Sequence, residues 1–471
     1  MQNLAQKVWQ LKHWIIALVI LQAVVCTFLL QSPFRDVSHS QCAQSFIKTV
    51  PVLNTPLLAT AGPTARFRGN LREDVKYITS WPANGWSNQV IEFMNLIYVA
   101  RLTERVPIVP RFRPVHIEGE NVSHIDFGAV FDLPRLQQEL RTPILEWNEV
   151  KDIASNIVED LGCWDIQHKT WQKDKNFLEP PSDLHLDISY TPVPKWVFAA
   201  LRTPTEQNDR DMFLWPLASL IAFNKRATDL EMFPKPVLSP IHQTVHPPDD
   251  HVFCTNKLYF GLHLLESAQD LSPAWQDVGR HMHWTAALEE IAVDYTRQTL
   301  GLKLDQEIPP VVHRRACAPP RLRHLVQYIA VHVRRRDFAI WCRIDGIPLS
   351  KCFPPISAYE RQVNTIQAQI FENKGVSVDH VIVTSDERDP RWWEGALELG
   401  WVRPDHSRTV EIHGPWYAIF IDAVIQGNAE GFVGTDTSTV SILARRRVVS
   451  RGGVGEMVTW VAGHDREGSG A

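Results

Sequence analysis

Short apolar runs alternate with helical patterns in the last third of the chain. Runs of strand length lie at residues 325–333, 380–384 and 431–433. Apolar residues recur at helical spacing in residues 359–370, 392–399, 416–425 and 438–446. Alternation of strand and helix is typical of a parallel sheet with helices on both faces. The pattern predicts a doubly wound, Rossmann-like α/β domain over residues 324–450.

A second pattern of the same kind begins near residue 75. A predicted strand at residues 75–80 is followed by turn-forming residues, a helix through Leu102 and a strand at residues 106–109. This unit predicts a first Rossmann-like domain over residues 73–308, whose less periodic, proline-interrupted remainder forms surface excursions. Residues 309–323 are predicted to be a linker, and the glycine-rich residues 451–471 a disordered tail.

The amino terminus differs in composition from the rest of the chain. Residues 14–31 are apolar apart from two glutamines and one threonine, and Lys7 and Lys12 precede them without an acidic residue. We predict a transmembrane signal anchor, with residues 1–13 as a cytoplasmic tail and residues 32–72 as a stem. The chain would then be a single-pass type II membrane protein of the Golgi or endoplasmic reticulum, with its catalytic part in the lumen. The alternative is a cleaved signal peptide.

The overall composition argues against nucleic acid and zinc as ligands. There are 48 basic and 53 acidic side chains, so no global positive field attracts nucleic acid and any anion site has to be local. Six of the seven cysteines lie outside the membrane segment, an even number that suits a disulfide-permitting compartment. Their pairing cannot be read from the sequence. No cluster of cysteine and histidine has zinc spacing, so no metal site is expected.

Charged and hydroxyl residues follow three of the predicted strands. Residues 332–337 contain three consecutive arginines, residues 385–386 are Ser-Asp, and residues 434–439 are rich in threonine and serine. The carboxyl ends of parallel strands share one edge of the sheet, so these loops should converge. Arginine forks and the free N–H groups at a helix start both bind phosphate, whereas Asp386 suits a guanine edge or a ribose hydroxyl. The loops together predict a nucleotide diphosphate pocket.

Simpler interpretations of these residues remain open. The arginines can form a solvated loop, Ser438 or Thr439 a plain helix cap, and Asp386 the start of a turn. Arg445 to Arg447 are predicted to be a solvated helix end rather than ligands. If the strand continues, alternation places His332, Arg334 and Arg336 on one face and turns Arg335 away from them.

At these loops the chain resembles a known family. His332-Val333-Arg334-Arg335-Arg336-Asp337-Phe338 resembles the HxRxxD signature of GDP-fucose-dependent fucosyltransferases, especially the protein O-fucosyltransferases. Val383-Thr384-Ser385-Asp386 is similar to that family's Ala-Thr-Asp loop, and residues 432–441 resemble its Phe-Ile-Gly-Thr-x-x-Ser-Thr-Phe-Ser segment. Gly85-Trp86-Ser87-Asn88-Gln89 is similar to its Gly-rich Asn-Gln loop. The four motifs occur in the family's order, whereas residues 115–310 match no motif of it.

The resemblance implies a GT-B-like fold, in which two Rossmann-like domains face a cleft. It also implies inverting, metal-independent transfer of fucose from GDP-fucose to a protein hydroxyl or a glycan, without a cofactor. Arg334 would then stabilise the departing β-phosphate and Asn88 would face the sugar. The remaining residues implied to bind the donor are His332, Asp337, Asp386, Thr435, Ser438, Thr439, Gly85 and Asn84, of which Asp386 would read guanine and Asp337 would brace the arginines.

One departure from the family affects the predicted chemistry. Where the thrombospondin-repeat type has a glutamate in a Pro-Pro-Glu-Gly loop as the proposed general base, this chain has Pro82-Ala83-Asn84-Gly85. Asn84 cannot take a proton, so another carboxylate such as Glu92 serves, departure of the leaving group dominates, or the acceptor differs. The loss also leaves open a non-catalytic protein that binds GDP-sugars or glycans, and another nucleotide sugar on the same fold.

Overall fold

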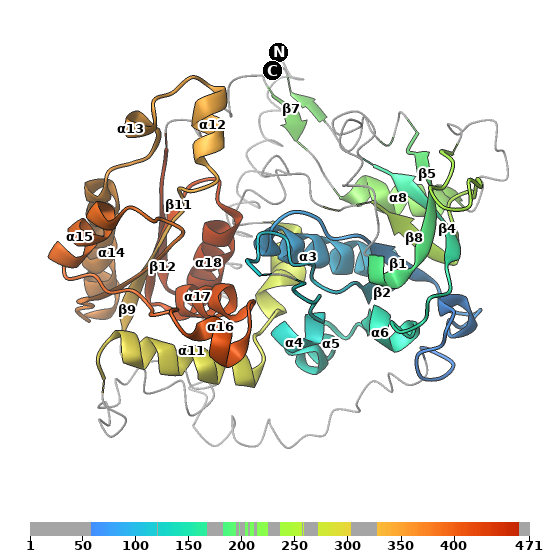
Figure 1. Cartoon of the computed structure of the whole chain (residues 1–471), viewed down its shortest axis with the longest axis horizontal. Helices are drawn as coiled ribbons and strands as arrows, with labels where there is room; N and C mark the ends of the chain where they lie inside the picture. Colours follow the sequence, from blue (N-terminus) through green and yellow to red (C-terminus); the bar gives the residue numbers. More distant parts are fainter. Residues whose placement is uncertain are drawn as a thin grey trace, which may run out of the picture. The chain divides into compact units, whose positions relative to one another are not determined.

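Two parallel β-sheets organise the computed structural model of this chain (Figure 1). The structure describes residues 58–119, 121–166, 182–194, 197, 203–205, 208–211, 214–224, 236–256, 258, 272–302 and 327–460. Both sheets belong to one unit, made of residues 51–309 and 324–471. The predicted anchor at residues 14–31 and the predicted linker at residues 309–323 lie outside the described residues. Within the described part of the chain, no helix has both the length and the apolar character needed to cross a membrane.

The first sheet has six parallel strands in the order β3-β2-β1-β8-β4-β5. They are β1 (Tyr77–Ser80), β2 (Val106–Val109), β3 (Leu145–Glu146), β4 (Glu159–Asp165), β5 (Leu186–Pro192) and β8 (Val252–Thr255). Pairing of Tyr77 with Val106 on one side and with Val252 on the other makes β1 a central strand. The predicted strand, helix, strand unit at residues 75–109 is therefore confirmed, and its β-branched and aromatic residues are buried on both faces.

Helices of the first half cover this sheet. They are α3 (Trp86–Leu102), α4 (Phe127–Val130), α5 (Leu133–Leu140), α6 (Trp147–Val150), α8 (Trp215–Asn224) and α10 (Pro273–Asp277), with 3-10 turns η2 (Phe67–Gly69), η4 (Ser182–Leu184) and η6 (Gly279–His281). A separate antiparallel hairpin consists of β6 (Thr203–Thr205) and β7 (Asn208–Asp211). Helix α3 is buried on nearly every side, including its polar residues Gln89, Glu92 and Asn95.

The second sheet has four parallel strands in the order β10-β9-β11-β12. They are β9 (Tyr328–Val333), β10 (His380–Ser385), β11 (Gly431–Thr435) and β12 (Val454–Val458). The helices of this half are α11 (Ala286–Thr299), α12 (Ala339–Ile344), α13 (Leu349–Cys352), α14 (Ile356–Lys374), α15 (Pro390–Glu398), α16 (Thr409–His413), α17 (Tyr417–Asn428) and α18 (Thr439–Ser450). The prediction of an α/β fold with two parallel sheets is confirmed.

Strand alternation explains why helices cover both faces of the second sheet. Ile329 and Val331 of β9 pack in one apolar cluster with residues of α14 and α15, such as Ile366. Tyr328 and Ala330 belong to the cluster that contains α17 and α18. Figure 1 shows α14 and α15 on one side of the sheet and α17 and α18 on the other. The sheet is thus doubly wound, as predicted.

Residues 58–72 correct the predicted stem. Phe67 and Leu71 are buried in the apolar core of the first half, and the backbone N–H of Phe67 donates to Glu159 over 2.8 Å. The low periodicity of this segment reflects its irregular backbone, which nevertheless packs on the sheet.

Residues 451–460 correct the predicted disordered tail. Strand β12 pairs in parallel with β11, and Trp460 is 3% exposed. The glycines of this segment allow close packing rather than disorder, because a Cβ on Gly453 would lie 2.6 Å from the Glu430 carbonyl oxygen. The second half therefore extends at least to Trp460.

Further contacts tie the two halves together. Helix α11 falls within the predicted first domain, yet it packs against α17, and its Tyr295 hydroxyl lies 2.8 Å from that of Thr409. Trp86 of α3 contacts Phe420 of α17, with ring centroids 5.4 Å apart. Aromatic rings thus occupy the space between the halves at Trp86. Disulfides join Cys163 to Cys254 and Cys342 to Cys352.

Candidate functional site

The loops after β9, β10 and β11 meet at the carboxyl-terminal edge of the second sheet. From β9 the chain passes to β10 on one side and then to β11 on the other. Ligands of doubly wound sheets bind at this reversal of strand order. The predicted convergence of the three loops is thus present in the structure.

His332 lies beneath the edge of the sheet rather than in the open. It is 6% exposed, and its Nδ1 is 2.7 Å from the Ser441 hydroxyl of α18. Burial, with a smaller contribution from the charge of Arg334, lowers the pKa of His332 to about 3. The ring is therefore neutral at physiological pH and supports α18 and the loop above it.

Thr435 also supports the site from below. Its hydroxyl accepts the backbone N–H of Arg334 over 2.9 Å, donates to the His332 carbonyl oxygen over 3.1 Å, and lies 2.9 Å from the Tyr359 hydroxyl. The residue is fully buried. The hydroxyl of Thr435 thus fixes the loop that carries Arg334, and contact of Thr435 with the donor stays a prediction.

Two carboxylates orient the guanidinium of Arg334. One Nη atom lies 2.6 Å from Asp337 and the other 3.2 Å from Asp386. The Arg334 side chain remains 27% exposed. The predicted bracing role of Asp337 agrees with this geometry, and the guanidinium is held in one orientation while part of it faces solvent.

Asp386 has a further role that the sequence does not predict. Its two carboxylate oxygens accept the backbone N–H groups of Arg335 and Arg336, over 2.8 and 3.2 Å. Three hydrogen bonds or ion pairs thus anchor the arginine loop on Asp386. Its role as a reader of guanine stays a prediction.

The other two arginines point to different partners. Arg335 pairs with Glu387 at 2.7 Å and lies over the Phe353 ring at 4.9 Å. Arg336 pairs at 3.0 Å with Glu118 of the first half, which also binds Arg388. The three arginines thus bind different carboxylates, and because β9 ends at Val333, strand alternation does not extend to them.

The amino ends of α3 and α18 meet beside this arginine loop. The Thr439 hydroxyl donates to Asn88 Oδ1 over 2.6 Å and lies 2.8 Å from the Ser87 hydroxyl. The residues before each helix, Gly85 and Ser438, form no side-chain cap. Two positive helix ends with four nearby hydroxyl or amide side chains therefore point to one place, which favours an anion.

The loop before α3 is held by buried polar side chains. Glu92 is fully buried and accepts the backbone N–H of Ala83 over 2.8 Å. Gln89 donates to the carbonyl oxygens of Asn84 and Arg113, over 2.8 and 2.9 Å. Asn84 adopts a left-handed backbone, with φ of 64°. Glu92 is thus a support for the loop and is not placed to act as a base.

Several supporting residues escape sequence reasoning. Ser441 and Ser87 lie within two of the family-like motifs, so their place in a motif is a sequence signal that could have identified them. Tyr359, Glu387 and Glu118 come from other segments, and only the fold places them beside the site.

Among known proteins, matches to this chain are found only with solved structures. No family model and no curated protein matches this sequence. POFUT1 in complex with GDP-fucose is 15% identical, with a TM-score of 0.45, and the match covers 82% of this chain and 98% of POFUT1. POFUT1 in complex with GDP is 13% identical, with a TM-score of 0.48 and coverage of 81% and 98%. The fucosyltransferase NodZ from Bradyrhizobium is 12% identical, with a TM-score of 0.37 and coverage of 79% and 92%. Fucosyltransferases are thus among the solved structures to which this chain is similar.

Proposed function

We propose that this chain is a glycosyltransferase that moves fucose from GDP-fucose to a hydroxyl of a protein or a glycan. The meeting of the amino ends of α3 and α18 beside Arg334 carries the proposal. Two helix dipoles and a fixed guanidinium form a site for a diphosphate. The four motifs that resemble fucosyltransferases favour GDP-fucose as the source of that diphosphate.

The proposed mechanism relies on stabilising the leaving group. The diphosphate of the donor lies at the two helix ends, with Arg334 against the β-phosphate. Because Asp337 and Asp386 already hold the guanidinium, little reorganisation is needed when negative charge develops as GDP leaves. The acceptor hydroxyl attacks the anomeric carbon from the opposite face as the bond from that carbon to the β-phosphate oxygen breaks, so the configuration inverts, and the hydroxyl proton passes to solvent. No metal ion or cofactor takes part in this proposal.

Neither Asn84 nor Glu92 can serve as a general base for the acceptor hydroxyl. Asn84 cannot accept a proton, and Glu92 is buried and bonded to Ala83. We therefore propose that departure of GDP lowers most of the barrier and that deprotonation of the acceptor contributes little.

Turnover of GDP-fucose tests the proposal directly. The full chain should slowly hydrolyse GDP-fucose to GDP and fucose, with water as the acceptor, and GDP should raise its melting temperature. Arg334→Ala should lower turnover by about 100-fold or more. Arg335→Ala is the matched control, because Arg335 pairs with Glu387 instead, and it should stay within about tenfold of the wild type. Absence of both turnover and stabilisation by GDP would refute the proposal.

Asn84 favours one other candidate, a protein that binds GDP-sugars without turning them over. In that case GDP and GDP-fucose would stabilise the chain to a similar extent, and no acceptor would gain fucose. A screen of peptide and glycan acceptors with radiolabelled GDP-fucose separates the two candidates.

We further propose that the chain acts in the lumen of the Golgi or endoplasmic reticulum, anchored by residues 14–31. The apolar composition of this segment and the lysines before it support the proposal. In intact microsomes, residues after the anchor should resist added protease until detergent is present.

A further inference from the structure

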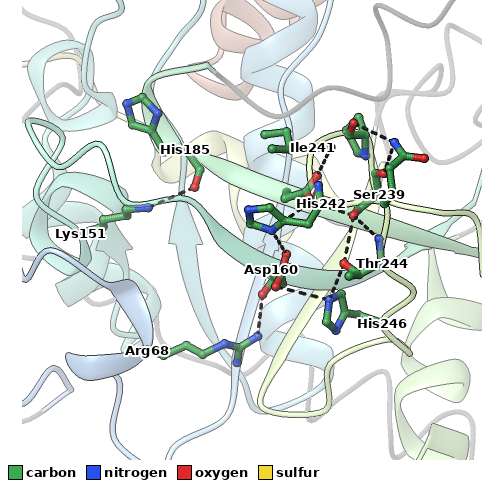
Figure 2. Close-up of polar contacts among 12 residues, drawn as sticks. Arg68, Lys151, Asp160, His185, Ser239, Ile241, His242, Thr244 and His246 are labelled. Carbon is green, nitrogen blue, oxygen red and sulfur yellow. Dashed lines mark hydrogen bonds and ion pairs between the residues drawn. The ribbon is translucent and has the colours of Figure 1, made fainter.

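Two aspartates and two histidines gather at the amino-terminal edge of the first sheet (Figure 2). Asp160 lies near the start of β4 and Asp187 near the start of β5. His242 and His246 belong to the loop at residues 236–251. The candidate diphosphate site lies instead at carboxyl-terminal strand ends, so this cluster is separate from it.

The loop that carries the histidines is fixed against both strands. Its Val237 N–H donates to the Tyr190 carbonyl oxygen over 2.7 Å, and its Asp249 N–H donates to that of Gly162 over 3.0 Å. A Cβ on Gly162 would lie 1.8 Å from the Pro247 carbonyl oxygen, so only glycine allows this approach. The histidines are therefore presented by an ordered loop.

Distances within the cluster fit a small metal ion. His242 Nδ1 lies 2.7 Å from Asp160 Oδ1 and 3.4 Å from Asp187 Oδ2. One ligand atom each of Asp160, Asp187 and His242 lies within 4.8 Å of the others. Ligands at tetrahedral Zn²⁺, each about 2.0 Å from the metal, stand about 3.3 Å apart. Small side-chain rotations therefore bring these three atoms to a common metal ion.

His246 supplies a fourth ligand atom, the second imidazole nitrogen, at the side of the cluster. Its Nε2 is 3.5 Å from Asp160 Oδ2 and 3.0 Å from the Thr244 hydroxyl. Figure 2 shows Asp160 between the two imidazoles. A side-chain rotation that releases Thr244 turns His246 toward the other three groups.

Asp187 is held as a fixed anion. Its side chain is fully buried and accepts the Ser239 hydroxyl over 2.7 Å and the backbone N–H groups of Ile241 and His242 over 2.9 and 2.6 Å. Supporting hydrogen bonds of this kind orient the ligands of metal sites.

The nearby cations have other partners. Arg68 pairs with Asp249 at 2.7 Å and donates to the backbone carbonyl of Asp160, while Lys151 pairs with Glu159 at 3.2 Å. With neutral imidazoles, the two carboxylates give the cluster a charge that matches a divalent cation. The Asp160 and His242 side chains are 35% and 42% exposed, so a metal ion can reach them from solvent.

We propose that Asp160, Asp187 and His242 bind Zn²⁺, with His246 as the fourth ligand. Mixed nitrogen and oxygen ligands favour Zn²⁺ over Mg²⁺ or Ca²⁺, which prefer oxygen alone. The metal ion fastens the loop at residues 236–251 to β4 and β5 and takes no part in sugar transfer. A search for zinc spacing in the sequence misses the site because its ligands come from three separate segments.

Titration calorimetry of the untagged full chain with ZnCl₂ tests the proposal. The wild type should bind one Zn²⁺ per chain, and Asp160→Asn and His242→Gln should each weaken binding at least about tenfold. His246→Ala should weaken it to a smaller extent. His380→Ala removes an exposed histidine of the second half and should bind as the wild type does. No binding by the wild type, or equal loss in His380→Ala, would overturn the proposal.

A second measurement guards against variants that fail to fold. Circular dichroism without metal identifies folded variants, and Zn²⁺ should raise the melting temperature of the wild type but not of folded Asp160→Asn. An equal rise in both proteins would contradict the assignment of Asp160. Neither readout depends on GDP-fucose, so the metal site and the proposed transferase activity can fail separately.

Discussion

At the scale of single residues, Asp386 is where sequence and structure suggest different roles. The family resemblance makes it a reader of guanine, whereas its oxygens here accept the N–H groups of Arg335 and Arg336 and pair with Arg334. If its main role is to position the arginine loop, Asp386→Ala should weaken binding of GDP and ADP by a similar factor, about tenfold or more.

Calorimetric titration of both nucleotides against wild type and variant measures this effect. Asp379→Ala, which removes an exposed aspartate of the same half that bonds only to Ser377 in the described structure, is a suitable control. A selective loss of GDP binding, with ADP unchanged, would show that Asp386 contacts guanine instead.

The sequence predicts much of the residue-scale arrangement where strand alternation applies. It places alternate residues of β9 on the two faces of the sheet, as for Ile329 and Val331 against Tyr328 and Ala330, but the strand ends before the arginines. It cannot rank partners that come from other segments, such as Glu118 for Arg336 or Glu387 for Arg335. Choosing among several exposed carboxylates requires the fold.

At the scale of elements, the junction of α3 and α18 depends on Thr439. Its hydroxyl joins Asn88 and Ser87 at the two helix ends. Thr439→Val keeps the shape of the side chain but removes these bonds, so GDP binding should weaken about tenfold or more. Thr365→Val removes a similar hydroxyl, which bonds to its own helix in α14, and should leave binding of GDP unchanged. Equal binding by the Thr439 variant would place the diphosphate elsewhere.

A second prediction at this scale concerns Glu146, which supports the start of α4. Its carboxylate accepts the Gly128 N–H over 2.9 Å, and burial raises the pKa of Glu146 to about 7. The folded state therefore binds the carboxyl proton of Glu146 more tightly than the unfolded state does, because the pKa of an unperturbed glutamate is about 4.3. Ionisation costs stability increasingly as pH rises from about 4 to 7, and the full cost persists above that range.

Glu146→Gln removes this cost and keeps an acceptor for Gly128. Relative to the wild type, the variant should gain stability as pH rises from 5 to 8, by at most about 3 kcal/mol. Urea denaturation at several pH values measures the gain. Glu372→Gln, on the exposed face of α14, should show no such trend. A pH-independent difference for Glu146→Gln would contradict the raised pKa.

Elements with periodic patterns are predicted well, and those built on irregular segments are missed. The ends of strands β9, β10 and β11 lie within two residues of the predicted positions, except that β9 begins three residues later than predicted. Strand β12 is missed because the glycines around it indicate a loop, although they permit close packing. Helices α12 and α13 are too short for a periodic signal, and a disulfide joins them.

At the scale of the whole molecule, the structure corrects the predicted role of Arg446 and Arg447. The sequence predicts a solvated helix end for them, but Arg446 is 2% exposed. The Arg447 guanidinium lies 4.2 Å from the Trp284 ring centroid and donates to the Met282 carbonyl oxygen over 2.8 Å. The sequence of α18 does not predict this contact, because the aromatic partner of Arg447, Trp284, lies in a segment without recognisable motifs.

Arg447 therefore links α18 to residues that precede the second sheet in the chain, and its loss should affect both halves. Together the cation–π contact and the hydrogen bond are worth about 2 to 3 kcal/mol when partly buried. Because one apolar cluster contains residues of both halves, including Trp86 and Phe420, we expect the described core to unfold in a single transition. Arg447→Ala should lower the midpoint of that transition without splitting it. Arg408→Ala removes an exposed arginine paired with Glu411 and should shift the midpoint far less. Differential scanning calorimetry distinguishes these outcomes, and two separate transitions in the wild type would mean that the two halves are not coupled through this cluster.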